Sequence, residues 1–368
     1  MALVSPAVAS AVAPPTAVVT MGDSYISGEA GRWLGNSPNL VLDRDGTDRA
    51  CVFTLGVCTS YDENKVYLGG SAADGCHRSD VAEVNSAQFP VAKRINIACS
   101  GAITSDLFRS SSGGTMAHGE TPQADQLLPI AQANKIRMIV VSIGGNDLGF
   151  AAIVQACFTA YLTKGTPCSQ SQAAALSDAN LAAAATNVTK VIDEIRAVMR
   201  TAGYADSSYR LVLQTYPAVL PRAADARYAE IDPQRTVYGC PFYDADLDWG
   251  HNVAAPRIGS MVKTAAAARG VEVIDMLHVF DGHEFCAKTD AAATPLGAPP
   301  PASSEWGRAV SASTIAQGET QELFHPDAYG QMALGDCLTD LYAATRGTFA
   351  CTGAAGRTPQ QMVVTKTG

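Results

Sequence analysis

Four short blocks of the sequence carry side chains that could act together in nucleophilic chemistry. They read Met21-Gly22-Asp23-Ser24-Tyr25, Asn96-Ile97-Ala98-Cys99-Ser100-Gly101-Ala102, Ser142-Ile143-Gly144-Gly145-Asn146-Asp147 and Glu322-Leu323-Phe324-His325-Pro326-Asp327. A serine hydroxyl becomes a nucleophile when a base such as histidine takes its proton. Backbone N–H groups and an asparagine carboxamide can stabilise the negative charge that then develops on the substrate oxygen. Together the blocks hold the residue types that acyl transfer requires.

Each block by itself has an ordinary structural explanation. Ser24 could be the N-cap of a helix, a position that serine strongly favours. The glycine-containing second and third blocks could be turns, and a lone histidine is usually structural or exposed. The sequence has no G-x-S-x-G, the motif of the standard α/β-hydrolase nucleophile. The chemistry therefore depends on whether the fold brings the blocks together.

Most of these blocks follow segments that are typical of β-strands. Strands are predicted over residues 17–21, 94–98, 136–143, 209–216 and 271–275. The near-continuous β-branched run at 136–143 is typical of a strand that is buried on both faces, as in a parallel sheet. Open α/β sheets bind their ligands at the carboxyl ends of the strands. The blocks are therefore predicted to meet at one edge of a sheet.

Helical patterns lie between the strands. Helices are predicted over residues 171–201 and 257–269 and from about Pro326 onward. In the first of these, apolar residues recur at i, i+3, i+4 and i+7, which gives one apolar face. Alternating strands and helices predict an α/β fold. We expect a three-layer α/β/α sandwich with a mostly parallel, five-stranded sheet.

The chain shows neither an internal repeat nor a clear linker, so residues 16–352 are predicted to form a single domain. Residues of about 35–80 and 218–249 are expected to be large loop insertions pinned by disulfides. Residues 1–15 are small and apolar without a cationic start, and we interpret them as a signal-peptide remnant or spacer. Residues 353–368 are expected to form a flexible tail.

Composition limits the partners and the compartment. The 368 residues carry a formal net charge of −9, and no basic stripe suited to nucleic acid occurs. No stretch of about 18 uninterrupted apolar residues is present that could span a membrane. The ten cysteines include no CxxC pair, which favours disulfides in an oxidising compartment over zinc or redox motifs. The alternative is a cytosolic protein with buried thiols.

The order of the four blocks resembles that of the SGNH (GDSL-type) hydrolase family, over residues of about 18 to 338. GDS comes first, followed by NxxxSG, GGND and HP. The resemblance implies a flavodoxin-like sandwich in which Ser24 is the nucleophile and His325 the general base. The N–H groups of Ser24 and Gly101 and the side chain of Asn146 would form the oxyanion hole. The implied reaction is acylation of Ser24 followed by hydrolysis.

Two positions depart from the family pattern. Tyr25 stands where many members have leucine, which we interpret as a packing change. Glu322 stands three residues before the histidine, where many members have aspartate. Glu322 could orient His325 through its Nδ1 atom, and we favour some contribution from it. Alternatively, the backbone carbonyl of Leu323 fills that role, as in some secreted members.

The resemblance also suggests how the cysteines pair. It implies Cys76–Cys99, Cys157–Cys168 and Cys240–Cys286, and proximity in sequence adds Cys51–Cys58 and Cys337–Cys351. Cys99 lies two residues before Gly101, so we hypothesise that its bridge braces the oxyanion-hole loop. Reduction should then impair activity before it unfolds the core.

The substrate remains open among esters. A lipase or esterase fits, as do a phospholipase A, a polysaccharide O-acetyl esterase and an acyltransferase. The alternative is a non-catalytic relative that binds glycan or lipid, and such a relative would be expected to have a damaged site. No cofactor is expected. The cluster of Asp275, His278, Asp281, His283 and Glu284 matches no defined metal motif, so we expect no metal. We expect a secreted, extracellular monomer that acts on a small-molecule or lipid ester and binds no nucleic acid.

Overall fold

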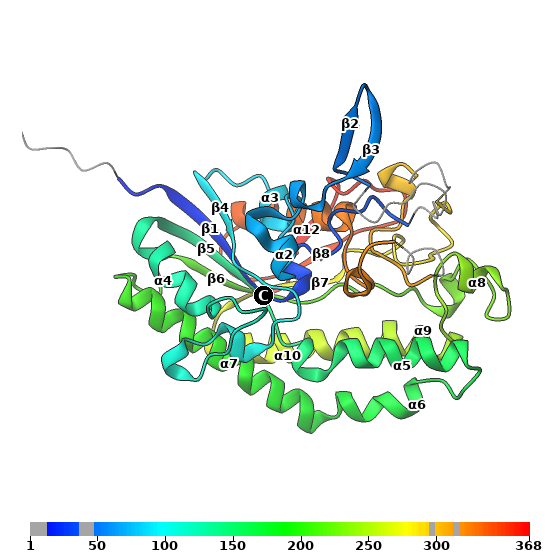
Figure 1. Ribbon diagram of the computed structural model, residues 1–368. Helices are drawn as coiled ribbons and strands as arrows, with labels where there is room; N and C mark the ends of the chain where they lie inside the picture. The colour runs from blue at the N-terminus through cyan, green and yellow to red at the C-terminus, as the bar shows by residue number, and fades with distance from the viewer. Residues whose placement is uncertain (1–12, 37–47, 294–298, 312–316) are drawn as a thin grey trace, which may run out of the picture.

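A central sheet runs through the molecule in the strand order β4-β1-β5-β6-β7-β8-β9 (Figure 1). The computed structural model describes residues 13–36, 48–293, 299–311 and 317–368. The strands of this sheet are β1 Thr16–Gly22, β4 Lys93–Asn96, β5 Lys135–Ser142, β6 Arg210–Gln214, β7 Glu272–His278, β8 Thr348–Thr352 and β9 Val363–Lys366. All neighbouring strands pair in parallel except β9, which is antiparallel to β8.

Helices cover both faces of the sheet. Figure 1 shows α4, α7 and α10 on one face and α3 and α12 on the other. The helices are α1 Ser24–Ser27, α2 Ser71–Asp74, α3 Glu83–Ser86, α4 Gln123–Ala133, α5 Phe150–Leu162, α6 Ser169–Gln172, α7 Asp178–Thr201, α8 Gln234–Val237, α9 Asp244–Trp249, α10 Ala255–Arg269 and α12 Ala328–Ala343. The predicted three-layer α/β/α sandwich is thus confirmed.

The sheet has seven strands rather than the predicted five. Both missed strands lie at the C-terminal end of the chain, where β8 and β9 are short and contain several polar residues. Such segments lack the apolar run that marks a buried strand. Although the sequence predicts a flexible tail over residues 353–368, this segment contains β9, which extends the sheet at its edge.

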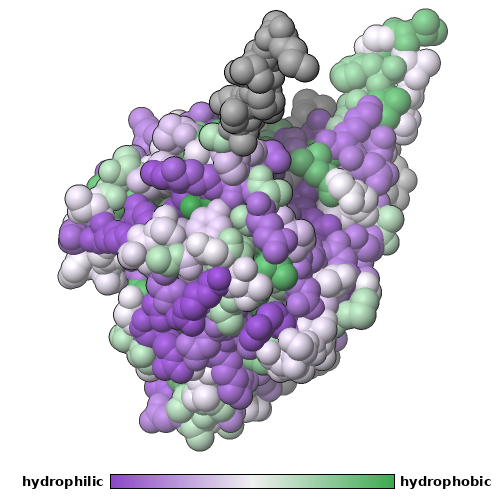
Figure 2. All heavy atoms as spheres, turned by 90° about the vertical axis from the view of Figure 1, so that its left-hand side faces the viewer, coloured by the Kyte–Doolittle hydropathy of each residue, from purple (hydrophilic) through white to green (hydrophobic). Residues whose placement is uncertain are grey.

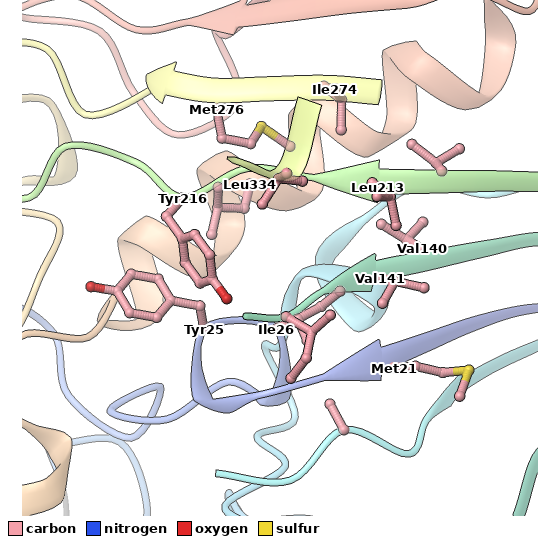
Figure 3. Packing of buried hydrophobic residues seen from close by; sticks show 14 of the residues in the cluster. Met21, Tyr25, Ile26, Val140, Val141, Leu213, Tyr216, Ile274, Met276 and Leu334 are labelled. Carbon is pink, nitrogen blue, oxygen red and sulfur yellow. The ribbon is translucent and has the colours of Figure 1, made fainter. Parts of the chain in front are cut away.

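The core forms where the central strands meet the helices. Residues 138–142 of β5 are all buried, as expected for a strand covered on both faces. Figure 3 shows Val141 of β5, Leu213 of β6 and Ile274 of β7 packed side by side from adjacent strands. Because these strands are rigidly packed, the loops at their carboxyl ends start from fixed positions.

The two predicted insertions differ in form. The first contains the antiparallel hairpin β2 Cys51–Thr54 and β3 Val57–Tyr61, which projects from the body (Figures 1 and 2). It exposes Phe53, Leu55 and Val57. The second insertion contains α8 and α9. Residues 37–47 of the first insertion lie outside the described residues, as do residues 1–12 of the segment interpreted as a signal-peptide remnant or spacer.

All ten cysteines are paired in the structure. The disulfides are Cys51–Cys58, Cys76–Cys99, Cys157–Cys168, Cys240–Cys286 and Cys337–Cys351. These are the pairs that family resemblance and proximity suggested. Among the described residues, no helix is both long and apolar enough to cross a membrane.

Candidate active site

The proposed nucleophile lies in the turn between β1 and α1. Gly22 has a φ of +136°, and a Cβ at this position would lie 1.9 Å from the Ser142 carbonyl oxygen, so only glycine fits. Asp23 is the N-cap of α1, and its carboxylate accepts a hydrogen bond from the Tyr25 N–H at 3.1 Å. Ser24 is therefore not the N-cap, and its hydroxyl is available for another partner.

That partner is His325. Its Nε2 atom lies 2.7 Å from the Ser24 hydroxyl oxygen, and its Nδ1 atom lies 3.0 Å from the Leu323 carbonyl oxygen. A carbonyl can only accept, so Nδ1 carries the proton and Nε2 is left to accept from the serine. Burial lowers the pKa of His325, and nearby Glu29 and the Leu323 carbonyl offset this only in part. The imidazole is therefore held in the neutral form that a base requires.

The carboxylate of Glu322 points away from this histidine, contrary to the contribution we favoured. It accepts hydrogen bonds from Arg32 Nε at 2.6 Å, from Trp33 Nε1 at 3.0 Å and from the Tyr67 hydroxyl at 2.6 Å. Burial alone would raise the pKa of Glu322, but the charge and hydrogen bonds of Arg32 outweigh it and hold the pKa below its usual value. With its oxygens satisfied by these donors, Glu322 anchors the loop, and the Leu323 carbonyl faces the imidazole.

The three residues predicted to form the oxyanion hole line one cavity together with His325. Ser24 is the first residue of α1, so its N–H has no intrahelical acceptor. Gly101 follows β4 with a φ of +76°, a conformation that favours glycine. Asn146 follows β5, and its side-chain amide donates one hydrogen bond to the Ala102 carbonyl at 2.9 Å. Its second N–H remains for a ligand.

The sequence comparison agrees with this geometry. The model of the GDSL-like Lipase/Acylhydrolase family matches residues 67–333, more than half of the 368 residues. The chain belongs to this family. The matched segment includes Gly101, Asn146 and His325, whereas Ser24 precedes it. The resemblance noted in the sequence is thereby confirmed.

Solved structures similar to this GDSL-like hydrolase are distant in sequence. An extracellular lipase from Streptomyces rimosus is 20% identical with a TM-score of 0.49, and the alignment covers 90% of this chain and 100% of that one. A phospholipase A1 from Streptomyces albidoflavus is 20% identical with a TM-score of 0.45, covering 87% and 95%. A carbohydrate acetylesterase from Sinorhizobium meliloti is 11% identical with a TM-score of 0.37, covering 89% and 98%. No curated protein matches the sequence.

The cavity beside Ser24 in this GDSL-like hydrolase has a volume of about 680 Å³. One wall is α5, which contributes Phe150, Ile153 and Phe158. Other lining residues come from the second insertion and α10, where a π-helical turn over Gly250–Ala254 joins α9 to α10. Most of the lining side chains are apolar, and its volume lies in the range usual for small-molecule sites. The polar lining residues include Ser24, Asn146 and His325, and also Gln155 and Asp246.

Sequence reasoning missed two residues of this site. Tyr216 lines the cavity, and its hydroxyl donates to the carboxylate of Asp23 and accepts from the Gly145 N–H. Burial raises the pKa of Asp23 to about 7, although the Tyr216 hydrogen bond partly opposes this. His118 is exposed, has a φ of +49° and also lines the cavity. The position of Tyr216 at the carboxyl end of a predicted strand was a signal that could have identified it.

Near His325 in the chain, Glu322 belongs to a cluster of side chains of the types that bind metal ions. Glu29, His77 and Glu322 each place one potential ligand atom within 4.8 Å of the others. Both acids are already occupied, since Glu322 pairs with Arg32 and Glu29 contacts His77 Nδ1 at 2.8 Å. A divalent cation here would face the guanidinium of Arg32, which disfavours it electrostatically. This cluster fits a buried ion-pair network better than a metal site.

Proposed function

We propose that this GDSL-like hydrolase cleaves carboxylic esters through an acyl-enzyme on Ser24. The observation that carries the proposal is the 2.7 Å contact between His325 Nε2 and the Ser24 hydroxyl. The contact joins residues 301 positions apart in the chain. The distance is within the hydrogen-bond reach that proton transfer requires. A relative that only binds ligands would have no need to preserve it.

In the first half of the reaction, the Ser24 oxygen attacks the ester carbonyl carbon while His325 Nε2 takes the hydroxyl proton. The carbonyl oxygen becomes an oxyanion and accepts hydrogen bonds from the N–H groups of Ser24 and Gly101 and from the Asn146 amide. When the tetrahedral intermediate collapses, the bond to the leaving alcohol breaks. The protonated His325 gives its proton to that alcohol oxygen, leaving an acyl ester on Ser24.

In the second half, water replaces the alcohol. His325 takes a proton from the water as its oxygen attacks the acyl carbon, and the same donors hold the oxyanion. Collapse breaks the bond to the Ser24 oxygen, which regains a proton from His325. The products are a carboxylic acid and free enzyme. The Nδ1–H group bonded to the Leu323 carbonyl keeps Nε2 directed at the serine in both halves.

The cavity favours an ester with an extended apolar acyl chain, as in a lipase or long-chain esterase. Side chains such as Phe150, Val154 and Ile258 would enclose such a chain and bury its methylene groups, each worth about 0.8 kcal/mol. An O-acetyl group has a single methyl group and would leave most of the 680 Å³ unused. A phospholipase A, which also cleaves acyl esters, is the second candidate, and a polysaccharide O-acetyl esterase fits this cavity less well.

We also propose that the protein acts outside the cell. The five disulfides support this, because such bonds persist in oxidising compartments and are rare in cytosolic proteins. Expression into an oxidising compartment and into a reducing cytosol should give active protein only, or mainly, from the former.

The test is hydrolysis of p-nitrophenyl esters from acetyl to palmitoyl by the wild-type protein and by Ser24→Ala. Loss of the nucleophile should lower kcat on the order of 10⁶-fold. Ser27→Ala, which removes a buried hydroxyl from the same short helix, is the matched control and should keep most of the activity. Equal activity of Ser24→Ala and wild type would refute the proposal.

The acyl-chain preference is tested separately by filling the cavity. Val154→Trp on α5 should lower kcat/KM for the longest esters and leave acetyl ester hydrolysis largely intact. Val237→Trp, at an exposed site on α8, provides the control. An equal loss for all chain lengths would mean that acyl chains do not occupy this cavity.

A further inference from the structure

Two tyrosine rings pack against each other beside the nucleophile turn (Figure 3). Tyr25 directly follows Ser24, and Tyr216 comes from the loop after β6. Their ring centroids lie 5.2 Å apart in an edge-to-face arrangement with an interplanar angle of 88°. Both side chains are buried, and both hydroxyls reach past this contact to a different loop of the site.

The Tyr25 hydroxyl reaches the histidine loop. It donates a hydrogen bond of 2.7 Å to the carbonyl oxygen of Phe324, the residue between Leu323 and His325. Phe324 has a φ of +69°, a conformation that is costly for a bulky residue and persists only where the surroundings hold it. The Tyr25 ring also lies 5.0 Å from the His325 ring. One side chain thus holds the peptide that links the base to its carbonyl partner.

The Tyr216 hydroxyl reaches the loop that carries Asn146. It accepts a hydrogen bond of 3.1 Å from the Gly145 N–H and donates to the Asp23 carboxylate. A Cβ on Gly145 would lie 3.3 Å from the Tyr216 ring, so this ring packs directly on the glycine backbone. Gly145 immediately precedes Asn146, which starts the following 3-10 turn. Tyr216 therefore ties the Asn146 loop to the turn that presents Ser24.

We propose that Tyr25 and Tyr216 are positioning residues, Tyr25 for the base His325 and Tyr216 for the oxyanion donor Asn146. The proposal rests on the ester hydrolysis proposed for Ser24. Because His325 has a single backbone carbonyl at Nδ1 instead of a carboxylate, its ring depends on the conformation of residues 323–325. The Tyr25 hydroxyl fixes that conformation from the residue next to the nucleophile. The tyrosine in place of the common leucine is then functional and not merely a packing change.

The two hydroxyls should have distinguishable kinetic effects. His325 must protonate the leaving oxygen of an alkyl ester, whereas p-nitrophenolate is a stable anion that leaves without a proton. A misplaced His325 should therefore slow the hydrolysis of alkyl esters more than that of p-nitrophenyl esters. A misplaced Asn146 weakens the oxyanion hole, which both substrates use in the same way. Tyr216→Phe should consequently slow both substrates equally.

The experiment compares Tyr25→Phe and Tyr216→Phe with matched controls on an alkyl ester and a p-nitrophenyl ester of the same acid. Tyr161→Phe removes a hydroxyl that donates to one backbone carbonyl, as Tyr25 does, and Tyr204→Phe removes one that both accepts from a backbone N–H and donates to a carbonyl. Each site variant should lose about 10- to 100-fold in kcat, the scale expected for a misplaced catalytic group. The controls should stay within about twofold.

Thermal melting shows whether the kcat losses come from unfolding. The site and control variants should lose similar stability, so a larger kcat loss in the site variants has another cause. Should Tyr216→Phe fail to fold, Asp23→Asn, which weakens the acceptor of the same hydroxyl, takes its place. A loss in Tyr25→Phe no greater than in Tyr161→Phe, or one that is equal for both leaving groups, overturns the assignment of Tyr25. Likewise, a leaving-group-dependent loss in Tyr216→Phe overturns its assignment.

A second readout does not depend on hydrolysis. In ¹⁵N-histidine NMR, His325, assigned with His325→Asn, should be a single Nδ1–H tautomer in the wild type and in Tyr161→Phe. In Tyr25→Phe it should become a mixture of tautomers. If the wild-type protein cleaves no ester, the proposed function fails, and the NMR result still decides whether Tyr25 positions His325. An unchanged His325 spectrum in Tyr25→Phe refutes that role.

Discussion

Two histidines in this molecule, the buried His283 and the half-buried His325, have opposite surroundings. His283 has the pairing expected of a catalytic triad, since its Nδ1 atom lies 3.0 Å from a carboxylate oxygen of Asp290, and its ring stacks on Trp306 at 3.9 Å. His325 has only a backbone carbonyl at Nδ1, yet it is the one that contacts a serine hydroxyl. A histidine–carboxylate pair is therefore not what distinguishes His325, the base that we propose. Contact with the nucleophile is the better criterion.

The pKa values of these two histidines move in opposite directions. Burial would lower the pKa of His283, but the hydrogen bond and charge of Asp290 outweigh it and leave the pKa raised. For His325, burial dominates and the pKa is lowered. A carboxylate partner thus favours a charged imidazole that is suited to an ion pair, whereas a carbonyl partner keeps the imidazole neutral. The neutral form is the one that can accept the Ser24 proton.

The largest expected effect comes from removing each histidine in turn. His325→Ala should lower kcat on the order of 10⁶-fold, as loss of the base does in serine hydrolases, with little change in melting temperature. His283→Gln should lower the melting temperature and leave kcat nearly unchanged. It breaks a buried hydrogen bond and leaves Asp290 underpaired, which should cost about 1–3 kcal/mol of stability. Steady-state kinetics and thermal melts of both variants provide the measurement. A large loss of kcat in folded His283→Gln would contradict this division of roles.

Glu322 tests whether a carboxylate near the base matters to catalysis. Glu322→Gln breaks a buried ion pair with Arg32, so we expect a stability loss of about 3 kcal/mol. Turnover by the folded variant should stay within a few-fold of wild type. If Glu322 acted as the acid of a triad, kcat would fall about 10⁴-fold. Glu63→Gln, which removes the more exposed partner of the same arginine, is the control and should cost less than about 1 kcal/mol.

Sequence reasoning predicted the parts of the molecule that depend on local pattern. Strands 17–21 and 136–143 were predicted from apolar runs, and the structure has β1 and β5 there. The helix predicted at 257–269 is also present, as α10. The long helix predicted over 171–201 instead has a break at Ser177, which caps α7. The strands β8 and β9 were missed because both are short and contain several polar residues, so neither shows a continuous apolar run.

In the site, too, local pattern predicted some residues but not the contacts between distant ones. Ser24, Gly101, Asn146 and His325 could be selected because each lies in a recognisable block. The partner of His325 could not be read from the sequence, since the choice between Glu322 and the Leu323 carbonyl depends on Arg32, Trp33 and Tyr67, which are distant in the chain. The role of Tyr216 likewise depends on a hydroxyl that reaches a residue 193 positions away. Such contacts follow only from the tertiary fold.

A smaller effect is expected from removing the disulfide Cys76–Cys99 beside the site. Cys76–Cys99 joins the first insertion to the loop after β4, and the Cys76 carbonyl accepts the Ser100 N–H at 3.1 Å, one residue before Gly101. The double variant Cys76→Ala/Cys99→Ala should lose about tenfold in kcat through the loosened oxyanion hole, and about 2–4 kcal/mol of stability. Cys51→Ala/Cys58→Ala, in the projecting hairpin, should leave kcat unchanged. If activity falls only as the protein unfolds, Cys76–Cys99 does not support the oxyanion-hole loop.

The smallest effect is a displacement of the pH profile, and it bears directly on the carbonyl-bound histidine. Only neutral His325 accepts the Ser24 proton, so kcat/KM should fall as the pH drops through the pKa of His325 in the free enzyme. Because that pKa is lowered, the acid limb should lie below the ordinary value of about 6.5. Buried Asp23, with a pKa of about 7, also titrates beside the serine, so the profile is measured for wild type and for Asp23→Asn. An acid limb below pH 6.5 in both wild type and Asp23→Asn assigns that limb to His325. A limb near 7 that disappears in Asp23→Asn would instead make Asp23 the controlling group.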